Sequence, residues 1–229
     1  SFMTRALDRI RSIPGVVAAG ATDTIPMGGN SNDSVILAEG YEMKPAESLV
    51  SPNQIVVTAG YFEAMQIPLV EGRFFDNRDD KDSQRVVIVE QRLAHKFWPN
   101  GSPDGKRMWR PGSADGLVHP DKNAEWFTVV GVVGSTKLRA LVDTDERVGI
   151  YYFPYDQTPR DLITFAVRST MEPGSLISAT RSAVSQIDAE LPLYDVHTME
   201  ERVDESLITR RSPMLIAAVF GLVALFLAA

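Results

Sequence analysis

The sequence predicts an α+β domain, because segments with strand periodicity and segments with helix periodicity are grouped along the chain rather than strictly alternating. A helix and a strand open the chain, and a strand, a helix and a further strand are expected near its end. The middle is rich in β-branched runs. With 229 residues, of which 44% are apolar and 23% charged, the chain can bury a proper core.

The first expected element is an amphipathic helix over residues 3–13. Its apolar residues recur at steps of three and four with arginines between them, and Pro14 and Gly15 end the pattern. Residues 16–22 then read as a strand. Residues 26–33 are rich in turn formers, so we expect an exposed, mobile loop there.

The middle of the chain predicts buried strands at residues 55–58, 86–89 and 127–133, each a short apolar run bounded by polar or glycine residues. Residues 99–123 hold four prolines and four glycines, which excludes a long regular element. We therefore expect an elaborated surface loop between the last two strands.

The C-terminal part begins with a strand in which Ile163, Phe165 and Val167 form the buried face. The alternating residues, Thr164, Ala166 and Arg168, are expected on a partly exposed face. A helix is expected from Pro173 to near Pro192, because apolar residues recur at helical spacing between the two prolines. These are Ile177, Thr180, Val184, Ile187 and Leu191.

A short strand over residues 194–197 and a final helix are expected next. Thr198 and Glu201 have the spacing of a capping box, in which each side chain accepts a bond from the other residue's backbone amide. The apolar residues of this helix, Met199, Val203 and Leu207, share one face.

An unbroken apolar run over residues 214–229 predicts the beginning of a transmembrane helix. Its 16 residues would span roughly 24 Å at 1.5 Å per residue, just short of a ~30 Å bilayer core. The alternative is a buried C-terminal core helix, but such a helix keeps a polar face, which this run lacks. The opening residues contain neither an initiator methionine at position 1 nor a signal peptide, so we expect an excised fragment.

Composition excludes several classes of function. A formal charge of −7 opposes binding to nucleic acid, which needs clustered lysine and arginine to release counterions. The absence of cysteine excludes disulfides, thiolate zinc sites and a cysteine nucleophile.

Two segments superficially resemble ligand loops. Residues 101–107 approach the pattern of a phosphate-binding loop, but the glycines are one residue too close, and Arg107 stands where Ser or Thr must hold magnesium. A cluster of aspartates is interleaved with Arg78 and Lys81 and lacks the glycine and glutamate of a calcium loop, so we expect a solvated loop. The cluster consists of Asp76, Asp79, Asp80 and Asp82.

Signals for catalysis are weak. The histidines match no zinc-hydrolase pattern, and we interpret His95 as a helix surface residue and His197 as a strand residue. Ser34 and Ser135 lack the G-x-S-x-G elbow of a hydrolase. Tyr61, Phe62 and Met65 are expected to be core rather than a ligand groove. We therefore assign no catalytic, cofactor-binding or metal-ligating residue, and the binding residues stay unknown; the remaining histidine is His119.

The order of several segments resembles the MacB-like periplasmic core domain of FtsX/MacB-type ABC transporter permeases, and most of all the large permeases of acidobacteria. No single motif is diagnostic, but the resemblance covers roughly residues 14–229 in order. The segments are Val57-Thr58-Ala59-Gly60-Tyr61-Phe62-Glu63-Ala64-Met65, Gly72-Arg73-Phe74-Phe75, Val86 to Glu90 with Phe97-Trp98-Pro99, Phe127 to Gly134, Tyr151-Tyr152-Phe153-Pro154, and Leu193 to Val203 with Arg210-Arg211.

The resemblance implies a two-lobed domain: a Porter-like lobe built from residues 1–68 and 158–211, an inserted β-rich Sabre-like lobe over 69–157, and the start of a transmembrane helix over 212–229. It further implies a non-catalytic domain on the periplasmic side of the bacterial inner membrane. The expected partners are a cytoplasmic ABC ATPase, a second permease copy, the membrane, and a periplasmic protein, lipoprotein or small-molecule substrate. No cofactor is expected.

The implied function is the transmission of ATP-driven movement during export or lipoprotein handling. Two alternatives stay open. A membrane-anchored ligand sensor would need a concave pocket with converging polar groups, and a hydrolase would need a perturbed acid, base or nucleophile in a cleft.

Overall fold

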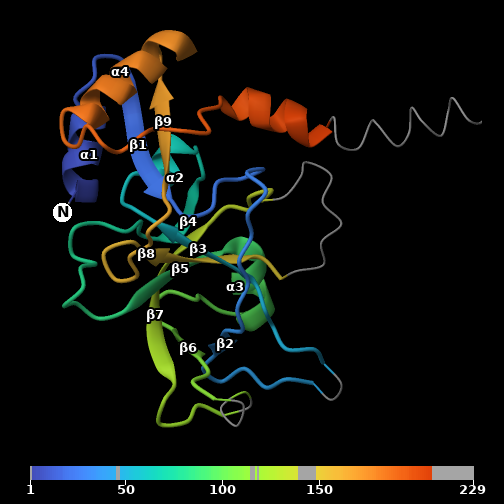
Figure 1. Ribbon diagram of the computed structural model, residues 1–229. Helices are drawn as coiled ribbons and strands as arrows, with labels where there is room; N and C mark the ends of the chain where they lie inside the picture. Colours follow the sequence, from blue (N-terminus) through green and yellow to red (C-terminus); the bar gives the residue numbers. More distant parts are fainter. Residues whose placement is uncertain (1, 45–46, 114–116, 118, 139–147, 208–229) are drawn as a thin grey trace, which may run out of the picture.

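A single mixed sheet of nine strands organises the computed structural model (Figure 1). The structure describes residues 2–44, 47–113, 117, 119–138 and 148–207. The strand order is β2-β6-β7-β5-β8-β3-β1-β9, and β4 pairs with β7 beside this path. The strands are β1 (Val16–Thr22), β2 (Leu37–Ala38), β3 (Asn53–Val57), β4 (Leu69–Gly72), β5 (Val86–Glu90), β6 (Arg107–Arg110), β7 (Glu125–Val133), β8 (Ile150–Pro154) and β9 (Thr164–Ser169).

Four labelled helices accompany the sheet, and residues 199–207 form a further helical segment. β3 pairs with β8 and β5 with β7 in parallel, whereas the other pairs are antiparallel. This combination makes the α+β fold that the sequence predicts. The labelled helices are α1 (Phe2–Arg11), α2 (Tyr61–Ala64), α3 (Gln91–Phe97) and α4 (Pro173–Ser185).

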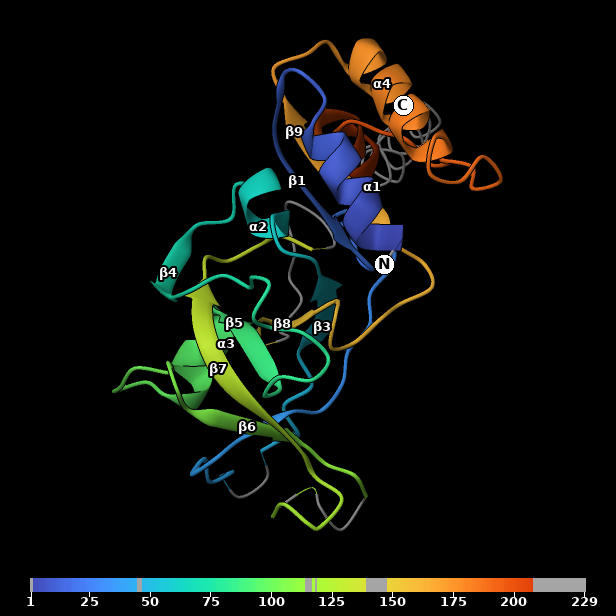
Figure 2. The same cartoon turned by 90° about the vertical axis from the view of Figure 1, so that its left-hand side faces the viewer.

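The two ends of the chain meet at β1 and β9. These strands pair antiparallel with Ala19 opposite Val167 and Ala21 opposite Phe165, and α1 and α4 lie on one side of them (Figure 2). α2 lies on the other side. Gly20 permits this approach, because a Cβ there would lie 2.3 Å from the backbone nitrogen of Tyr61.

Both faces of β9 are therefore covered, which corrects the expected burial of this strand. Phe165 and Val167 pack partly buried against the cluster formed by α1 and α4, as predicted. Ala166, expected to be partly exposed, is the most buried residue of the strand because it faces the cluster around α2.

The central part of the sheet is buried on both faces. Every residue of β3, β5 and β8 is buried, and α3 covers one side with Leu93, Ala94 and Phe97. Such continuously apolar strands are typical of parallel or doubly covered sheet positions. The predicted strands at 55–58, 86–89 and 127–133 are confirmed within one to two residues at each end.

Several sequence-based expectations are wrong in detail. α4 ends at Ser185 rather than near Pro192, and Leu191 is exposed. Residues 194–197 form no strand. β6 was not predicted and lies inside the expected loop 99–123. The loop at 26–33 contains no strand, yet Asp33 bridges Asn53 of β3.

No helix in the described part of the chain is both long enough and apolar enough to cross a membrane. The predicted transmembrane start at residues 212–229 lies outside the described residues, as do Arg210 and Arg211. The division into lobes at residues 69 and 157 stays a prediction. The pairing of β3 with β8 joins a strand from before this boundary to one from within the insertion.

Candidate functional site at the base of the C-terminal helix

The helical segment 199–207 begins at a fully formed capping box. The Thr198 amide donates to Glu201 Oε2 at 2.7 Å, and the Glu201 amide donates to Thr198 Oγ1 at 3.1 Å. Two amides that lack helical partners are thereby satisfied. The predicted start of this helix is confirmed, and its direction is set at its first turn.

Arg202 anchors this helix to the body of the domain. Its side chain is only 7% exposed, and Nη2 donates to Asp195 Oδ2 at 2.8 Å and to the Asp195 carbonyl at 3.3 Å. Gly28 lies beside it, since a Cβ on that glycine would be 3.6 Å from Arg202 Nη1. A buried guanidinium needs partners in fixed positions, so Arg202 ties the helix to the preceding chain at Asp195 and lies close to the loop after β1.

Asp195 is held in an unusual conformation to meet Arg202. Its φ of 52° lies in the left-handed region, which aspartate tolerates better than most residues. The hydrogen bond from Arg202 holds the pKa of the Asp195 carboxyl below its usual range. The predicted strand at 194–197 therefore gives way to a bent connector built around one ion pair.

His197 also belongs to this junction, and not to a strand as predicted. Its Nε2 lies 3.0 Å from Asp195 Oδ1, and its Nδ1 lies 4.0 Å from Glu201 Oε2 and 3.8 Å from Glu205 Oε1. Despite this concentration of carboxylates, no group of three potential metal ligands is assembled anywhere in the described ranges.

The terminal strands β9 and β1 join the central strands through one register pair, Thr22 of β1 opposite Val57 of β3. Side chains reinforce this seam between β1 and β3. Asp23 Oδ1 accepts from the Val56 amide at 2.9 Å, and Arg160 Nε lies 3.4 Å from Asp23 Oδ2. Burial raises the pKa of Asp23 despite these partners. Arg11 adds a clamp, as its Nη2 donates to the carbonyls of Ala19 and Ala59 at 2.9 and 2.6 Å.

An aromatic cluster fills the space behind the seam. Phe62 stacks on Phe74 with centroids 5.2 Å apart and meets Tyr152 edge to face at 5.0 Å. Tyr61 and Phe62 are fully buried and Met65 packs partly buried against them, so their prediction as core is confirmed. Because Phe62 comes from α2 and Tyr152 from β8, this cluster connects the terminal strands to the central ones.

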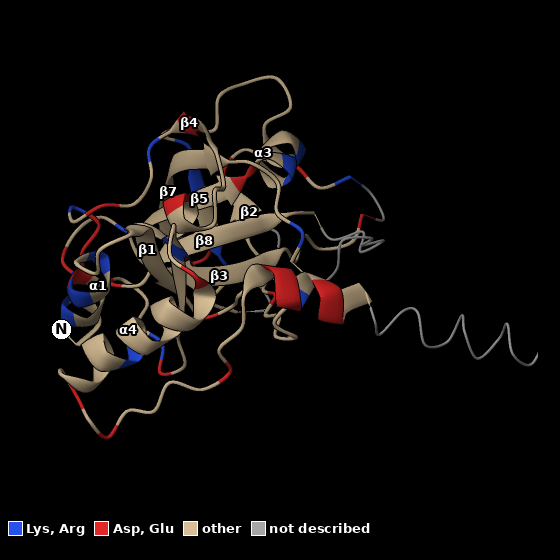
Figure 3. Cartoon of the chain, turned by 90° about the horizontal axis from the view of Figure 1, so that it is seen from above, with Lys and Arg blue, Asp and Glu red and all other residues tan. Residues whose placement is uncertain are grey.

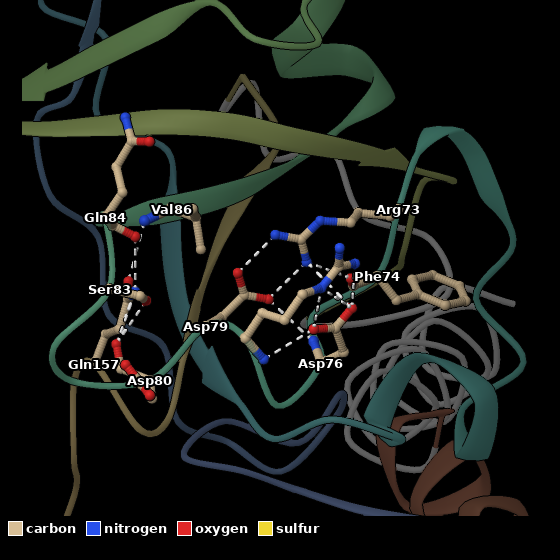
Figure 4. Close-up of polar contacts among 10 residues, drawn as sticks. Arg73, Phe74, Asp76, Asp79, Asp80, Ser83, Gln84, Val86 and Gln157 are labelled. Atoms are coloured by element: carbon tan, nitrogen blue, oxygen red, sulfur yellow. Dashed lines mark hydrogen bonds and ion pairs between the residues drawn. The ribbon is translucent and has the colours of Figure 1, made fainter.

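The predicted solvated loop after β4 is in part wrong, because one of its aspartates is buried. Arg73 donates to both carboxylate oxygens of Asp79 at 2.7 Å, as Figure 4 shows, and the Asp79 side chain is only 3% exposed. Asp76 pairs mainly with the exposed Arg78, at 2.7 Å, and also lies 3.7 Å from Arg73 Nη1. Gln157 closes the loop by accepting from the Val86 amide and donating to the carbonyls of Asp80 and Gln84.

The other residues considered from sequence lie apart. His95 is exposed on α3, as expected, and His119 and Ser135 are exposed elsewhere. The Ser34 carbonyl accepts from the Tyr151 hydroxyl at 3.3 Å. In residues 101–107, the Gly105 amide is committed to the Val129 carbonyl and Arg107 begins β6. Sequence reasoning missed Arg202, although its place beside the apolar stripe of Met199 and Val203 was a usable signal.

Comparison with known proteins identifies relatives of this arrangement. Curated relatives are the macrolide export ATP-binding/permease proteins MacB of Neisseria gonorrhoeae and Neisseria meningitidis serogroup B, each 33% identical over 67 residues. The aligned part is 28% of this chain and 10% of the relative, so the match spans about a tenth of those proteins.

Solved structures extend the likeness over most of the chain. The periplasmic region of MacB from Actinobacillus actinomycetemcomitans superposes with a TM-score of 0.51 at 15% identity, covering 82% of this chain and 74% of that one. At this identity the superposition shows the fold alone. The extracellular domain of the transporter YknZ from Gram-positive bacteria gives a TM-score of 0.47 at 16% identity, covering 82% of each chain.

The family model of the MacB-like periplasmic core domain matches residues 3–187. This range runs from the second residue of α1 to the residues just after α4 and so includes every labelled strand and all of the labelled helices but Phe2. The chain belongs to the family of MacB-like periplasmic core domains.

Proposed function

We propose that this chain is the non-catalytic extracytoplasmic domain of an ABC transporter permease in a bacterial inner membrane, and that it transmits ATP-driven movement to a substrate or partner protein. Membership of the family supports the place of the domain in such a permease. The observation that carries the transmitting role is the anchorage of helix 199–207 by the buried Arg202.

Transmission requires a stiff connection between the moving part and the domain. Helix 199–207 has its first turn capped by Thr198, and Arg202 binds Asp195 in the connector that follows α4. A rotation of this helix would therefore act on the connector and on the loop after β1 rather than be lost in a free linker. The apolar run at 214–229 continues from this helix in the sequence and is the part that we place in the membrane.

The lobes supply the second mechanical element. We propose that the terminal lobe, residues 1–68 and 158–211, and the insertion, residues 69–157, move against each other. Within the sheet, we place the boundary between the two moving parts at the seam between β1 and β3. Support comes from the difference in pairing: β1 and β9 share six register pairs, whereas β1 and β3 share one. Strand β3 would then travel with β8.

The pairing of the buried acidic residues with arginines supports a non-catalytic role. Asp79 and Glu90 are buried carboxylates, and each is paired with an arginine, Arg73 and Arg92. A general acid or base must be able to exchange its proton with a reacting group.

The partners we propose are a cytoplasmic ATPase, a second permease copy and a periplasmic protein or small-molecule substrate.

The test uses the full-length permease with its ATPase in membranes. Protease should digest this domain from the periplasmic side of intact spheroplasts. Arg202→Ala should lower coupled export by about tenfold while ATP hydrolysis continues, and Arg181→Ala on the exposed face of α4 should change neither. Resistance of the domain to protease added outside the spheroplasts would contradict the proposed periplasmic location. Unchanged export in Arg202→Ala would contradict the transmitting role.

A further inference from the structure

The connector between α4 and the last helix exposes an unusual concentration of apolar side chains. Leu191, Tyr194, Val196 and Met199 are 46%, 68%, 38% and 37% exposed, and we call these four residues the connector strip. Four of the nine exposed large hydrophobic residues in the described part of the chain thus lie within nine positions. Scattered exposed apolar residues need no explanation, but a local concentration indicates an interaction surface.

The strip is held in place before any partner arrives. Leu193 packs against the cluster of α1 and α4, Asp195 is bound by Arg202, and Thr198 closes the capping box. Side chains displayed on an already ordered backbone lose less conformational entropy on binding than those on a free linker. The connector is therefore suited to docking.

The charge around the strip is strongly one-sided. Residues 188–205 contain seven acidic residues and one arginine, giving −6 of the formal −7 of the whole chain. The arginine is Arg202, which is buried against Asp195. Acidic residues make up much of helix 199–207 (red in Figure 3), and Glu200, Glu201, Asp204 and Glu205 are exposed. None of the described basic side chains forms an ion pair with Glu200 or Asp204.

This charge selects among possible occupants. A second copy docking through the same strip would place like charges opposite each other, and anionic lipid headgroups would be repelled as well. The chain's own apolar run, residues 214–229, carries no lysine or arginine, and Arg210 and Arg211 before it are one pair rather than a basic rim. What complements the strip is an apolar surface surrounded by basic side chains.

We propose that the connector strip is the docking surface for a partner protein whose contact surface has apolar side chains rimmed by lysine and arginine. The inference rests on the proposed function in one respect, because the strip lies on the segment that would transmit movement. A partner bound there would be coupled directly to helix 199–207. Affinity would come from the apolar centre, and the rate of association from the charges.

Binding can be tested with defined probes on the full chain in detergent. The first probe is a fluorescent 18-residue amphipathic helical peptide with a leucine face and a lysine rim. The second carries glutamate in place of lysine, and the third carries serine in place of leucine. Only the first should bind. The variant Leu191→Ser/Tyr194→Ser/Val196→Ser should weaken its binding at least tenfold, whereas Val17→Ser/Leu49→Ser/Leu162→Ser, which alters exposed residues elsewhere, should not.

A second measurement locates the natural partner. A photo-crosslinking amino acid at Tyr194 in the full-length permease should give a product with another protein that is lost in Glu200→Lys/Asp204→Lys and absent with the crosslinker at Leu162. Three outcomes would overturn the proposal. The two triple-serine variants could bind the peptide equally well, the crosslinked product could consist of two permease copies, or the product could persist after charge reversal. These outcomes are separate from the Arg202→Ala export assay, so docking and transmission can fail independently.

Discussion

Two arginine–aspartate pairs in this domain are built in opposite senses. At the junction, Arg202 is the buried partner, and Asp195 is 55% exposed. In the loop after β4, Asp79 is the buried partner, and Arg73 is one-third exposed. Arg73 is bidentate, whereas Arg202 makes one bond to the carboxylate and one to the carbonyl of the same residue.

In each pair, the buried residue determines how strongly a substitution of its partner destabilises the fold. Loss of an exposed charge leaves its buried partner without compensation in a region where water cannot replace it. Arg73 bonds both oxygens of Asp79, so its loss removes two charge-assisted bonds and leaves the carboxylate only the Asp76 amide, which donates to Oδ2 at 3.0 Å. Arg202 keeps a backbone carbonyl when the Asp195 carboxylate is removed. The loop should therefore be the more sensitive of the two, and the junction the more adaptable.

The largest expected effect is that of Arg73→Ala. This variant leaves the buried Asp79 carboxylate without its bound cation and with only the Asp76 amide as a donor, and we expect the free energy of unfolding in urea to fall by about 3 kcal/mol. The double variant Arg73→Ala/Asp79→Ala should recover part of the loss, because the stranded charge is gone. Arg78→Ala, which breaks the exposed pair with Asp76, serves as control and should change the free energy of unfolding far less, because solvent screens that pair. Equal losses for Arg73→Ala and Arg78→Ala would contradict the comparison.

Asp195→Ala should have a smaller effect. Arg202 loses its charged partner and keeps the carbonyl, so we expect a loss of about 2 kcal/mol in the free energy of unfolding. Asp195→Asn should cost less, because asparagine tolerates the left-handed backbone and retains an acceptor oxygen. A loss larger than that of Arg73→Ala would reverse the order of the two pairs.

Thr198→Ala tests the cap beside the junction pair. Removal of the hydroxyl that accepts from the Glu201 amide should cost about 1 kcal/mol. Faster amide exchange should be confined to the first turn of helix 199–207. Thr198→Ser keeps the acceptor and should retain protection, and uniform acceleration across the sheet would show that the cap has a global role instead.

The smallest effect concerns acid stability. The pKa of Asp195 is lowered in the folded domain, so its contribution is complete above its ordinary pKa of 3.8 and is lost as the pH falls through the lower folded value. Asp195→Asn should flatten the stability curve in that acidic window. Asp23 has the opposite sign: its raised pKa makes its contribution decrease as the pH rises from 3.8 through the folded value. Parallel urea titrations of Asp195→Asn and Asp23→Asn should show slopes changed in opposite directions.

Local signals in the sequence were sufficient for most elements. Residues 16–22 and the buried runs at 55–58, 86–89 and 127–133 are dense in β-branched or small apolar residues, and each is a strand in the structure. The capping box at Thr198 was predictable because it depends on residues three positions apart. The segment 107–110 has the sequence Arg-Met-Trp-Arg, and it is a strand because β7 and β2 pair with it from distant parts of the chain.

The α+β class, the family and the start of the last helix could be predicted from the amino-acid sequence, because periodicity, motif order and caps are local properties. The burial of Asp79, the bent connector at residues 194–197 and its anchor Arg202 became apparent only in the folded domain. These outcomes depend on which side chain meets which partner across the fold. Whether a charged side chain is buried, and with which residue it pairs, depends on contacts between segments that are distant in the sequence, so neither follows from the order of the residues.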